Sequence, residues 1–220
     1  MKNMLFISAL FVSAFSFAQT ADSTYGMPPK FFEAMKKNVA VLDTATVKST
    51  FQQSYNSFDR LNNAEKSQWL PSYYMAYCLL VESYMDETSK TDDYCDQASH
   101  LLDHADSISP NNSEILVLRS MCASARIRVN PMTRGGKYGK ESGQWLDKAQ
   151  QADSTNPRIA YLRGTGLLYT PPAFGGGKDK AKPVLQDALK KFDAFRPASP
   201  VHPNWGRKQA EMMLAQCDQK

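Results

Sequence analysis

The chain is poor in the residues from which most metal and redox sites are built. Its 220 residues include 3 histidines and 4 cysteines, and no two cysteines form a CxxC pair. The sequence therefore indicates neither a zinc ribbon nor a dithiol redox motif. It also lacks a strong charge of one sign, because 26 Lys and Arg stand among 22 Asp and Glu for a formal charge of +4. This mixed balance argues against a nucleic-acid-binding surface.

Catalytic motifs are missing as well. There is no Gly-x-Ser-x-Gly nucleophile elbow and no Ser-x-x-Lys with supporting partners. His100 and His104 stand four residues apart, on one helix face, but two histidines alone are a weak metal motif, and we expect both to be solvated. His202 lies in a rigid Pro200–Pro203 turn and is interpreted as structural. We therefore expect no enzyme activity, no cofactor and no bound metal.

The one long hydrophobic run lies at the N-terminus. Lys2 precedes an apolar stretch over 4–17, and Ser16-Phe17-Ala18 fits a small-x-small cleavage site. This pattern predicts a signal peptide over 1–18, with an uncleaved anchor as the alternative. The polar residues 19–27 are expected to form a disordered tether before a single domain over 28–220. We expect a periplasmic or secreted protein, cleaved near Ala18, that has no membrane span afterwards and binds no nucleic acid.

Export changes what the cysteines mean. All four lie beyond the predicted cleavage point, in a compartment that permits disulfides. The sequence does not choose among the three pairings that four thiols allow, and buried free cysteines are an equal alternative. The four residues are Cys78, Cys95, Cys122 and Cys217.

A period of 44 residues runs through the chain. Leu102-Asp103-His104-Ala105 recurs as Leu-Asp-Lys-Ala over 146–149. Small residues recur at the same step, as Ala76, Ser120 and Gly164. The trio Ala98, Leu102 and Ala105 has counterparts over 142–149 and 181–188, and its spacing of four and three places each trio on one helix face.

Helix periodicity extends over most of the chain, and no stretch alternates with period two. We expect an all-α protein built from consecutive helix pairs. The predicted helices are 28–42 and 44–62, 67–85 and 91–108, 111–128 and 138–153, 156–170 and 178–195, and a final helix over 204–217.

The pattern of a small residue in one helix, followed by Ala-x3-Leu-x2-Ala in the next, resembles the tetratricopeptide repeat (TPR). The resemblance covers about residues 67–195 and implies a right-handed solenoid of about four antiparallel helix pairs with a C-terminal capping helix. A bundle of four helix pairs of another type is the alternative. Two features depart from the family: the period exceeds its roughly 34 residues, and Arg119 and Arg163 stand where it usually has apolar residues.

Two Gly-Gly segments share the pattern Pro-x2-(Arg/Phe)-Gly-Gly and are predicted to be loops inside the third and fourth pairs. We interpret both as structural turns that form a secondary contact edge, with anion binding as the alternative. The second segment resembles a loop in periplasmic TPR proteins that accompany TRAP-type solute transporters. The contact residues proposed here are Arg134, Gly135, Gly136, Phe174, Gly175 and Gly176.

In TPR-like stacking, the first helix of each pair lines a concave groove. The register places a mixed aromatic and weakly polar set there, of a kind enriched in interfaces. This predicts an exported protein- or peptide-binding scaffold without catalysis. The alternative is a small-solute-binding accessory protein of a transport system. The same side chains would be unavailable if they packed against the N-terminal helix or the C-terminal cap. The proposed groove residues are Tyr73, Tyr77, Met121, Arg158, Tyr161 and Tyr169.

Overall fold

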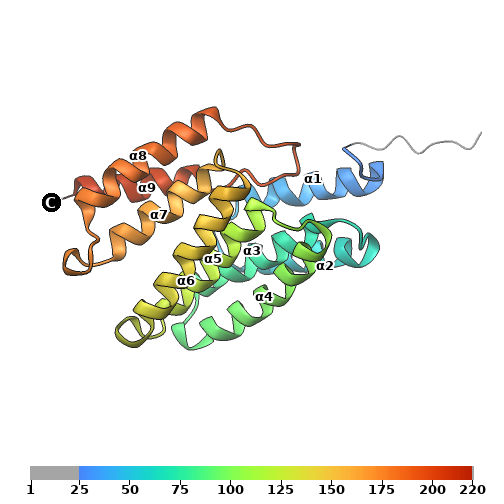
Figure 1. Ribbon diagram of the computed structural model, residues 1–220. Helices are drawn as coiled ribbons and strands as arrows, with labels where there is room; N and C mark the ends of the chain where they lie inside the picture. The colour runs from blue at the N-terminus through green and yellow to red at the C-terminus, as the bar shows by residue number, and fades with distance from the viewer. Residues whose placement is uncertain (1–24, 220) are drawn as a thin grey trace, which may run out of the picture.

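The computed structural model describes residues 25–219, so the predicted signal peptide lies outside the described residues. Within that range the chain forms nine α-helices, two short 3-10 helices and no strand, which confirms the all-α prediction (Figure 1). The α-helices are α1 (Pro29–Asp43), α2 (Lys48–Ala64), α3 (Trp69–Met85), α4 (Thr91–Ile108), α5 (Ser113–Ile127), α6 (Pro131–Ala152), α7 (Pro157–Tyr169), α8 (Lys178–Ala194) and α9 (Arg207–Asp218). The 3-10 helices are η1 (Thr88–Lys90) and η2 (Pro172–Phe174).

Consecutive helices pack as pairs: α1 with α2, α3 with α4, α5 with α6, and α7 with α8. Short connections make neighbouring helices run in opposite directions, and α9 packs against α8 and α7 (Figure 1). None of the helices in the described range is long and apolar enough to cross a membrane. The right-handed TPR-like solenoid remains a prediction for this set of pairs.

The small residues of the 44-residue series lie where helices approach closely. Ala76 and Ser120 are fully buried. A Cβ atom added at Gly164 in α7 would lie 2.6 Å from Cγ of Leu185 in α8, closer than a real contact allows. A larger side chain at this position would therefore push α8 away from α7.

The core is centred on α3, whose side chains are buried around most of its circumference. This fits its position against α2, α4 and α5, because a helix surrounded by partners has no polar face. The end of the expected tether packs against α1, where Met27 joins the core and Tyr25 stays exposed. Met27 is 3% exposed, and Tyr25 stacks on Phe32 with 5.6 Å between ring centroids.

One sequence-based boundary was wrong. The segment over 131–139 was predicted to be a loop, but α6 begins at Pro131 and includes Arg134, Gly135 and Gly136. The side chain of Asn130 caps this helix by accepting a hydrogen bond from the amide of Thr133 at 3.2 Å, and proline suits the first helical position. Capping and packing against α5 outweigh the helix-weakening effect of the glycines.

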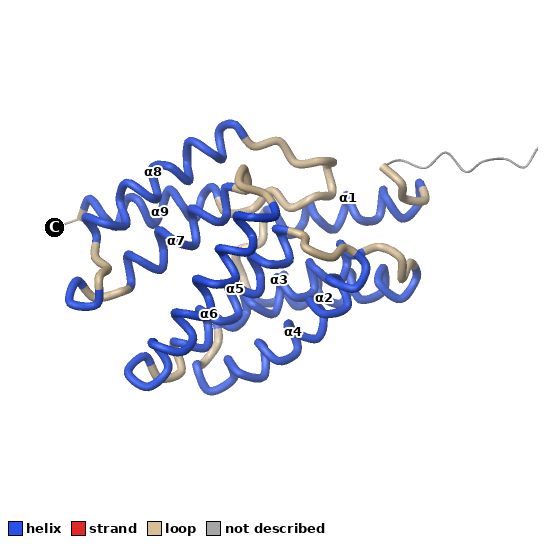
Figure 2. The backbone as a smooth tube through the Cα atoms, viewed as in Figure 1, coloured by secondary structure: helices blue, strands red, loops and turns tan. Residues whose placement is uncertain are grey.

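A long connection over 195–206 joins α8 to α9, and Figure 2 shows it as an extended loop that turns back on itself. We call it the C-terminal segment. It lies across α3: the hydroxyl of Tyr74 donates to the carbonyl oxygen of Val201 at 2.9 Å, and Val201 is fully buried. The indole nitrogen of Trp205 donates to the hydroxyl of Tyr73 at 2.8 Å. The segment therefore covers one end of the surface that was expected to be an open groove.

Candidate functional site

Arg158, predicted to line the groove, is buried inside the protein. Its side chain is 0% exposed and forms an ion pair with Glu114 of α5, with 2.9 Å between Nη1 and Oε1. Its Nη2 donates to the carbonyl oxygen of Pro203. The guanidinium carbon also lies 4.9 Å from the ring centroid of Phe195 and 5.2 Å from that of Trp205. Arg158 therefore anchors the C-terminal segment and does not face a ligand.

The tyrosines at the same end are covered too. Tyr77 stacks on Trp205 with ring centroids 4.8 Å apart, and Tyr73 is fully buried. Burial raises the pKa of both phenols above the usual range. Met121 of α5 is also buried, with 8% of its surface exposed. This end of the groove is filled by the protein's own C-terminal segment.

The last two predicted groove residues lie further along α7. Tyr161 is half-buried, and burial raises the pKa of its phenol to about 12. Tyr169, the last residue of α7, is 65% exposed. Its hydroxyl donates to Oε1 of Gln216 at 3.3 Å and lies 3.5 Å from Sδ of Met213, both on α9. Of the six predicted groove residues, only Tyr169 is largely exposed.

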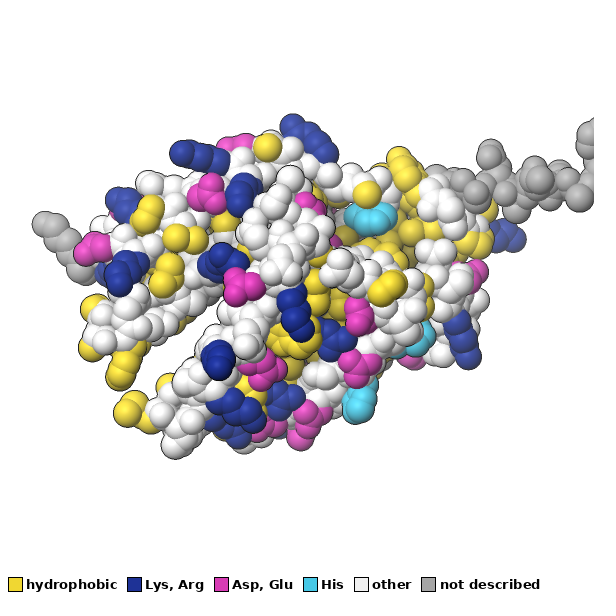
Figure 3. Space-filling model, viewed as in Figure 1, with side chains coloured by type: hydrophobic (Ala, Val, Ile, Leu, Met, Phe, Trp, Pro, Cys, Tyr) yellow, Lys and Arg dark blue, Asp and Glu magenta, His cyan; other side chains and the backbone are white. Residues whose placement is uncertain are grey.

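An open feature lies next to Tyr169. Figure 3 shows a notch between two arms, one formed by the start of α6 and the other by the end of α7 with η2. Exposed apolar side chains stand at the ends of both arms: Met132 is 88% exposed, and Phe174 is 76% exposed. We call this notch the slot.

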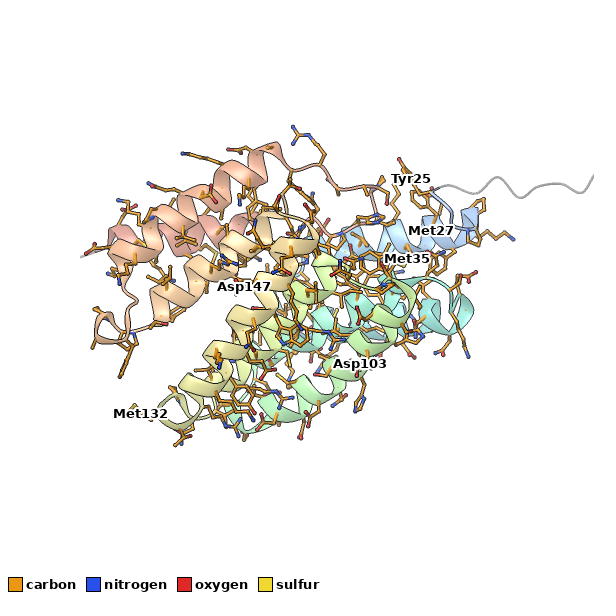
Figure 4. All side chains as sticks on the ribbon, viewed as in Figure 1. Tyr25, Met27, Met35, Asp103, Met132 and Asp147 are labelled. Atoms are coloured by element: carbon orange, nitrogen blue, oxygen red, sulfur yellow. The ribbon has the colours of Figure 1, made fainter. Side chains whose placement is uncertain are left out.

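The α6 wall of the slot carries almost no side chains. Gly136, Gly139 and Gly143 follow at spacings of three and four, so they share one helix face with Met132 at the tip and Asp147 at the root. Figure 4 labels the last two residues at these places along α6. A Cβ added at any of the three glycines would meet nothing within 4 Å. At these three positions α6 presents bare backbone to open space, and Lys140 lies at the edge of the same face.

The α7 wall carries side chains at its two ends and a glycine between them. Leu162, Gly166 and Tyr169 are four and three residues apart and lie on one face of α7. Leu162 packs against both hydrophobic clusters at the root of the slot, whereas a Cβ at Gly166 would again meet nothing within 4 Å. The wall therefore runs from packed core at Leu162 to an exposed aromatic ring at Tyr169.

The 44-residue register explains why the slot is open. One repeat earlier, the corresponding α4–α5 interface is filled by Cys95, Ser99 and Cys122. Sγ of Cys95 lies 3.4 Å from the carbonyl oxygen of Cys122, and the Ser99 hydroxyl lies 3.7 Å from Sγ of Cys122. Their counterparts 44 residues later are all glycine, namely Gly139, Gly143 and Gly166. The slot is thus an inter-repeat interface from which the side chains have been removed.

The root of this interface keeps its contacts. Asp147 of α6 pairs with Arg163 of α7 at 2.8 Å, and the corresponding pair one repeat earlier, Asp103 with Arg119, is 2.9 Å apart. The two arginines that departed from the TPR pattern therefore bind one repeat to the next. Leu146 and Ile159 belong to one buried cluster beside this pair. The slot is closed at its root and open at its tip.

The two Gly-Gly segments behave differently. Arg134 turns away from the slot and pairs with Asp92 of α4 at 2.8 Å, so it holds the start of α6 against α4. The Phe174 segment is a compact turn, as predicted. Gly175 has φ +88°, and a Cβ at Gly176 would lie 2.1 Å from the carbonyl oxygen of Thr170. This turn presents Phe174 to the solvent at the mouth of the slot.

The histidines do not meet in a metal site. His104 Nδ1 lies 2.9 Å from the hydroxyl of Ser72, and His202 Nδ1 lies 2.7 Å from that of Ser199. Across residues 25–219, no group of three His, Cys, Asp or Glu side chains could hold a metal ion. Sequence reasoning missed the slot, although the Gly136, Gly139 and Gly143 spacing could have revealed it. The arrangement is suited to receive a flat, apolar ligand between the glycine positions of α6 and Gly166 of α7.

Comparisons with protein-family models and with curated proteins find no match. Among solved structures, the chain is similar to the HusA haemophore from Porphyromonas gingivalis, with a TM-score of 0.78 and 38% sequence identity. The similarity covers 85% of this chain and 92% of the haemophore chain. At this identity and coverage, the chain belongs to the family of the HusA haemophore.

Proposed function

We propose that this protein is an exported haem-binding protein without catalysis of its own, and that the slot is its binding site. The observation that carries the proposal is the 38% identity to a haemophore over 92% of that protein's chain. The predicted signal peptide over 1–18 supports export. The small-solute alternative from the sequence is therefore preferred over a peptide-binding scaffold, and its link to a transport system stays a prediction.

The shape of the slot supports this ligand class. Haem is a flat ring system with two apolar faces, so it can enter a gap between two helices only where side chains do not already fill that gap. Gly139 and Gly143 on α6 and Gly166 on α7 leave the space between the two helices open at their positions. The apolar side chains of Met132 and Phe174 at the mouth would cover the part of the ring that extends outwards.

Charge at the slot fits the polar edge of the ligand. The two propionates of haem need solvent or a cation, and Lys140 is exposed on the same face of α6 as Gly136 and Gly143. Met132 at the rim carries a thioether that can bind haem iron, whereas the hydroxyl of Tyr169 is hydrogen-bonded to Gln216 of α9. The described histidines lie on α4 and in the C-terminal segment, away from the slot walls. We therefore expect binding that rests mainly on apolar contact with the ring.

The peptide-binding alternative has lost its main support. It depended on an open groove lined by Tyr73, Tyr77 and Arg158, and these residues are buried under the C-terminal segment. A peptide would have to displace Trp205 and Val201 to reach them, and so break the hydrogen bonds that hold this segment.

The proposal is tested by titrating the purified protein with haem and following the change in the haem absorbance spectrum. Leucines are introduced singly at two slot positions, as Gly139→Leu and Gly166→Leu. Each fills part of the slot and is expected to weaken haem binding by at least about tenfold, a change of roughly 1.4 kcal/mol. Gln144→Leu is the matched control, since it adds the same side chain at an exposed position on another face of α6.

Circular dichroism confirms that each variant keeps its helical content. Two outcomes contradict the proposal in different ways. Failure of the unaltered protein to bind haem rules out the function. Binding that is equally strong in the unaltered protein and in both slot variants moves the site elsewhere on the molecule.

A further inference from the structure

Two cysteines lie side by side between α4 and α5. Sγ of Cys95 lies 3.4 Å from the carbonyl oxygen of Cys122, and Sγ of Cys122 lies 3.5 Å from the carbonyl oxygen of Cys95. This reciprocal contact places the two residues directly opposite each other. Their exposed fractions are 0% and 6%. All four cysteines carry free thiols in this structure.

The surroundings of this pair favour a negative charge on one sulfur. The thiol of Cys95, the hydroxyl of Ser99 and the guanidinium of Arg126 lie beside Cys122 and lower its pKa below the usual range. The same interaction, together with burial, raises the pKa of Cys95 above its usual range. In the folded protein, Cys122 is therefore the more readily ionised thiol of the pair, and the thiolate is the form that attacks a disulfide.

The other two cysteines have no such contact. Cys78 is fully buried on α3, and burial raises the pKa of its thiol above the usual range. Cys217 lies near the end of α9, where its thiol donates to the carbonyl oxygen of Met213 at 3.5 Å. The 44-residue spacing of Cys78 and Cys122 reflects equivalent places in two repeats and does not bring them together as a pair. The fold therefore distinguishes pairings that the sequence left open.

We propose that Cys95 and Cys122 are an oxidation site, which forms an α4–α5 disulfide in exchange with a disulfide donor such as glutathione disulfide or a thiol–disulfide oxidoreductase. The thiolate of one cysteine attacks one donor sulfur, breaks the donor disulfide and releases the first donor thiol. The second cysteine then attacks the protein sulfur of this mixed disulfide and releases the second donor thiol. Two protein thiols lose two electrons and two protons, and both appear on the two donor thiols.

Burial determines when this exchange occurs. A donor reaches the pair while α4 and α5 are apart, during folding or local opening, and the finished bond is then shielded from reductants. The disulfide closes the chain from 95 to 122, which restricts the unfolded state and stabilises the fold. The inference does not depend on haem binding, because it concerns the filled interface one repeat before the slot.

The test uses the purified protein, reduced, unfolded and then refolded in a mixture of reduced glutathione and glutathione disulfide. Free thiols are blocked by alkylation, and the protein is digested and analysed by mass spectrometry without reduction. The expected result is a cross-linked pair of peptides containing Cys95 and Cys122, a loss of two hydrogens before alkylation, and alkylated Cys78 and Cys217. Protein recovered from an exported compartment is expected to show the same bond.

Cysteine variants test which two cysteines form the disulfide. A Cys78→Ala, Cys217→Ala double variant is expected to keep the two-hydrogen loss, and Cys95→Ala is expected to abolish it. Four alkylated cysteines in the refolded protein, or a bridge that includes Cys78 or Cys217, would overturn the proposal. Because the unaltered protein gives this answer, the result does not depend on whether the variants fold.

Discussion

Arg158 and Glu114 stand 44 residues apart and form a buried ion pair, 2.9 Å long, between equivalent positions of neighbouring repeats. Glu114 also accepts a hydrogen bond from the hydroxyl of Tyr73 at 3.3 Å, and that hydroxyl accepts one from Trp205. Arg158 in turn donates to Pro203. The network links α3, α5 and α7 to the C-terminal segment. It gives partners to Glu114 and to both terminal nitrogens of Arg158, which would be costly to bury alone, while Nε of Arg158 is buried without one.

Removing the arginine should strongly destabilise the protein. Arg158→Met leaves the carboxylate of Glu114 buried without its ion-pair partner and releases the carbonyl of Pro203. We expect a loss of about 3–5 kcal/mol in the free energy of unfolding, measured by urea denaturation. Arg163→Met is the control, since its partner Asp147 is exposed, and should cost about 0–1 kcal/mol. Equal losses in the two variants would contradict this role for Arg158.

Substitutions at the filled end of the predicted groove should destabilise the protein much more than substitutions at its open end. Tyr77→Ala removes the ring that stacks on Trp205 and leaves a cavity, with an expected loss of about 3–5 kcal/mol in unfolding free energy. Tyr169→Ala changes a ring that is 65% exposed and should shift stability by about 0.5 kcal/mol or less. Thermal and urea unfolding of both variants measure this contrast. A destabilising Tyr169→Ala with a neutral Tyr77→Ala would reverse the assignment.

Helix content and most helix boundaries could be predicted because they depend on local periodicity and capping. Ala98, Leu102 and Ala105 are fully buried, as their shared helix face required. The start of α6 was missed because a Gly-Gly pair is read locally as a turn, whereas the Asn130 cap and the packing of α6 on α5 determine the helix. The sequence carried the decisive signal in Asn130-Pro131, the same cap pattern that begins α7 at Asn156-Pro157.

The candidate site was harder to predict, because it depends on a segment far away in the chain. Whether Tyr73 lines a groove or a core is decided by Trp205, 132 residues later, and periodicity carries no information about that distance. The slot, in contrast, could be predicted from the 44-residue period. Gly139 and Gly166 occupy the positions that Cys95 and Cys122 occupy in the preceding repeat. A comparison of side-chain size at equivalent positions of the repeats would have indicated the slot.

His202 should make stability depend on pH. Burial lowers its pKa below the ordinary 6.5, and its ring lies edge-on to Trp69 with centroids 5.9 Å apart. Between the folded and unfolded pKa values, the unfolded chain binds more protons, so the free energy of unfolding rises with pH. The stabilisation is fully present above the unfolded pKa and is lost as pH falls through the folded pKa.

The measurement compares urea unfolding of the protein and of His202→Gln at about pH 5 and about pH 8. Other titrating groups act equally in both proteins, so the difference between their pH slopes isolates His202. We expect a smaller loss of stability at the acidic pH in the variant than in the unaltered protein. Parallel slopes would show that His202 is protonated as readily in the folded state as in the unfolded one.

The glycines of α6 should make the protein less stable than alanines at the same positions would. Gly139 and Gly143 are in a helix interior and meet nothing that an added methyl group would strike. The double variant Gly139→Ala, Gly143→Ala should therefore raise the free energy of unfolding by about 0.5–1 kcal/mol per site, because alanine loses less backbone entropy on forming a helix. The two methyl groups also narrow the slot, so haem binding should weaken as stability rises.

Gly164→Ala provides the opposite control on α7. Its methyl group would lie 2.6 Å from Cγ of Leu185, so this variant should lower the melting temperature, whereas the α6 variant raises it. Thermal unfolding and haem titration of both proteins separate packing from binding. Stabilisation of the α6 variant with unchanged haem affinity would mean that its glycines serve another purpose. Stabilisation with weaker haem binding would indicate that Gly139 and Gly143 serve ligand binding, although alanine would stabilise the helix.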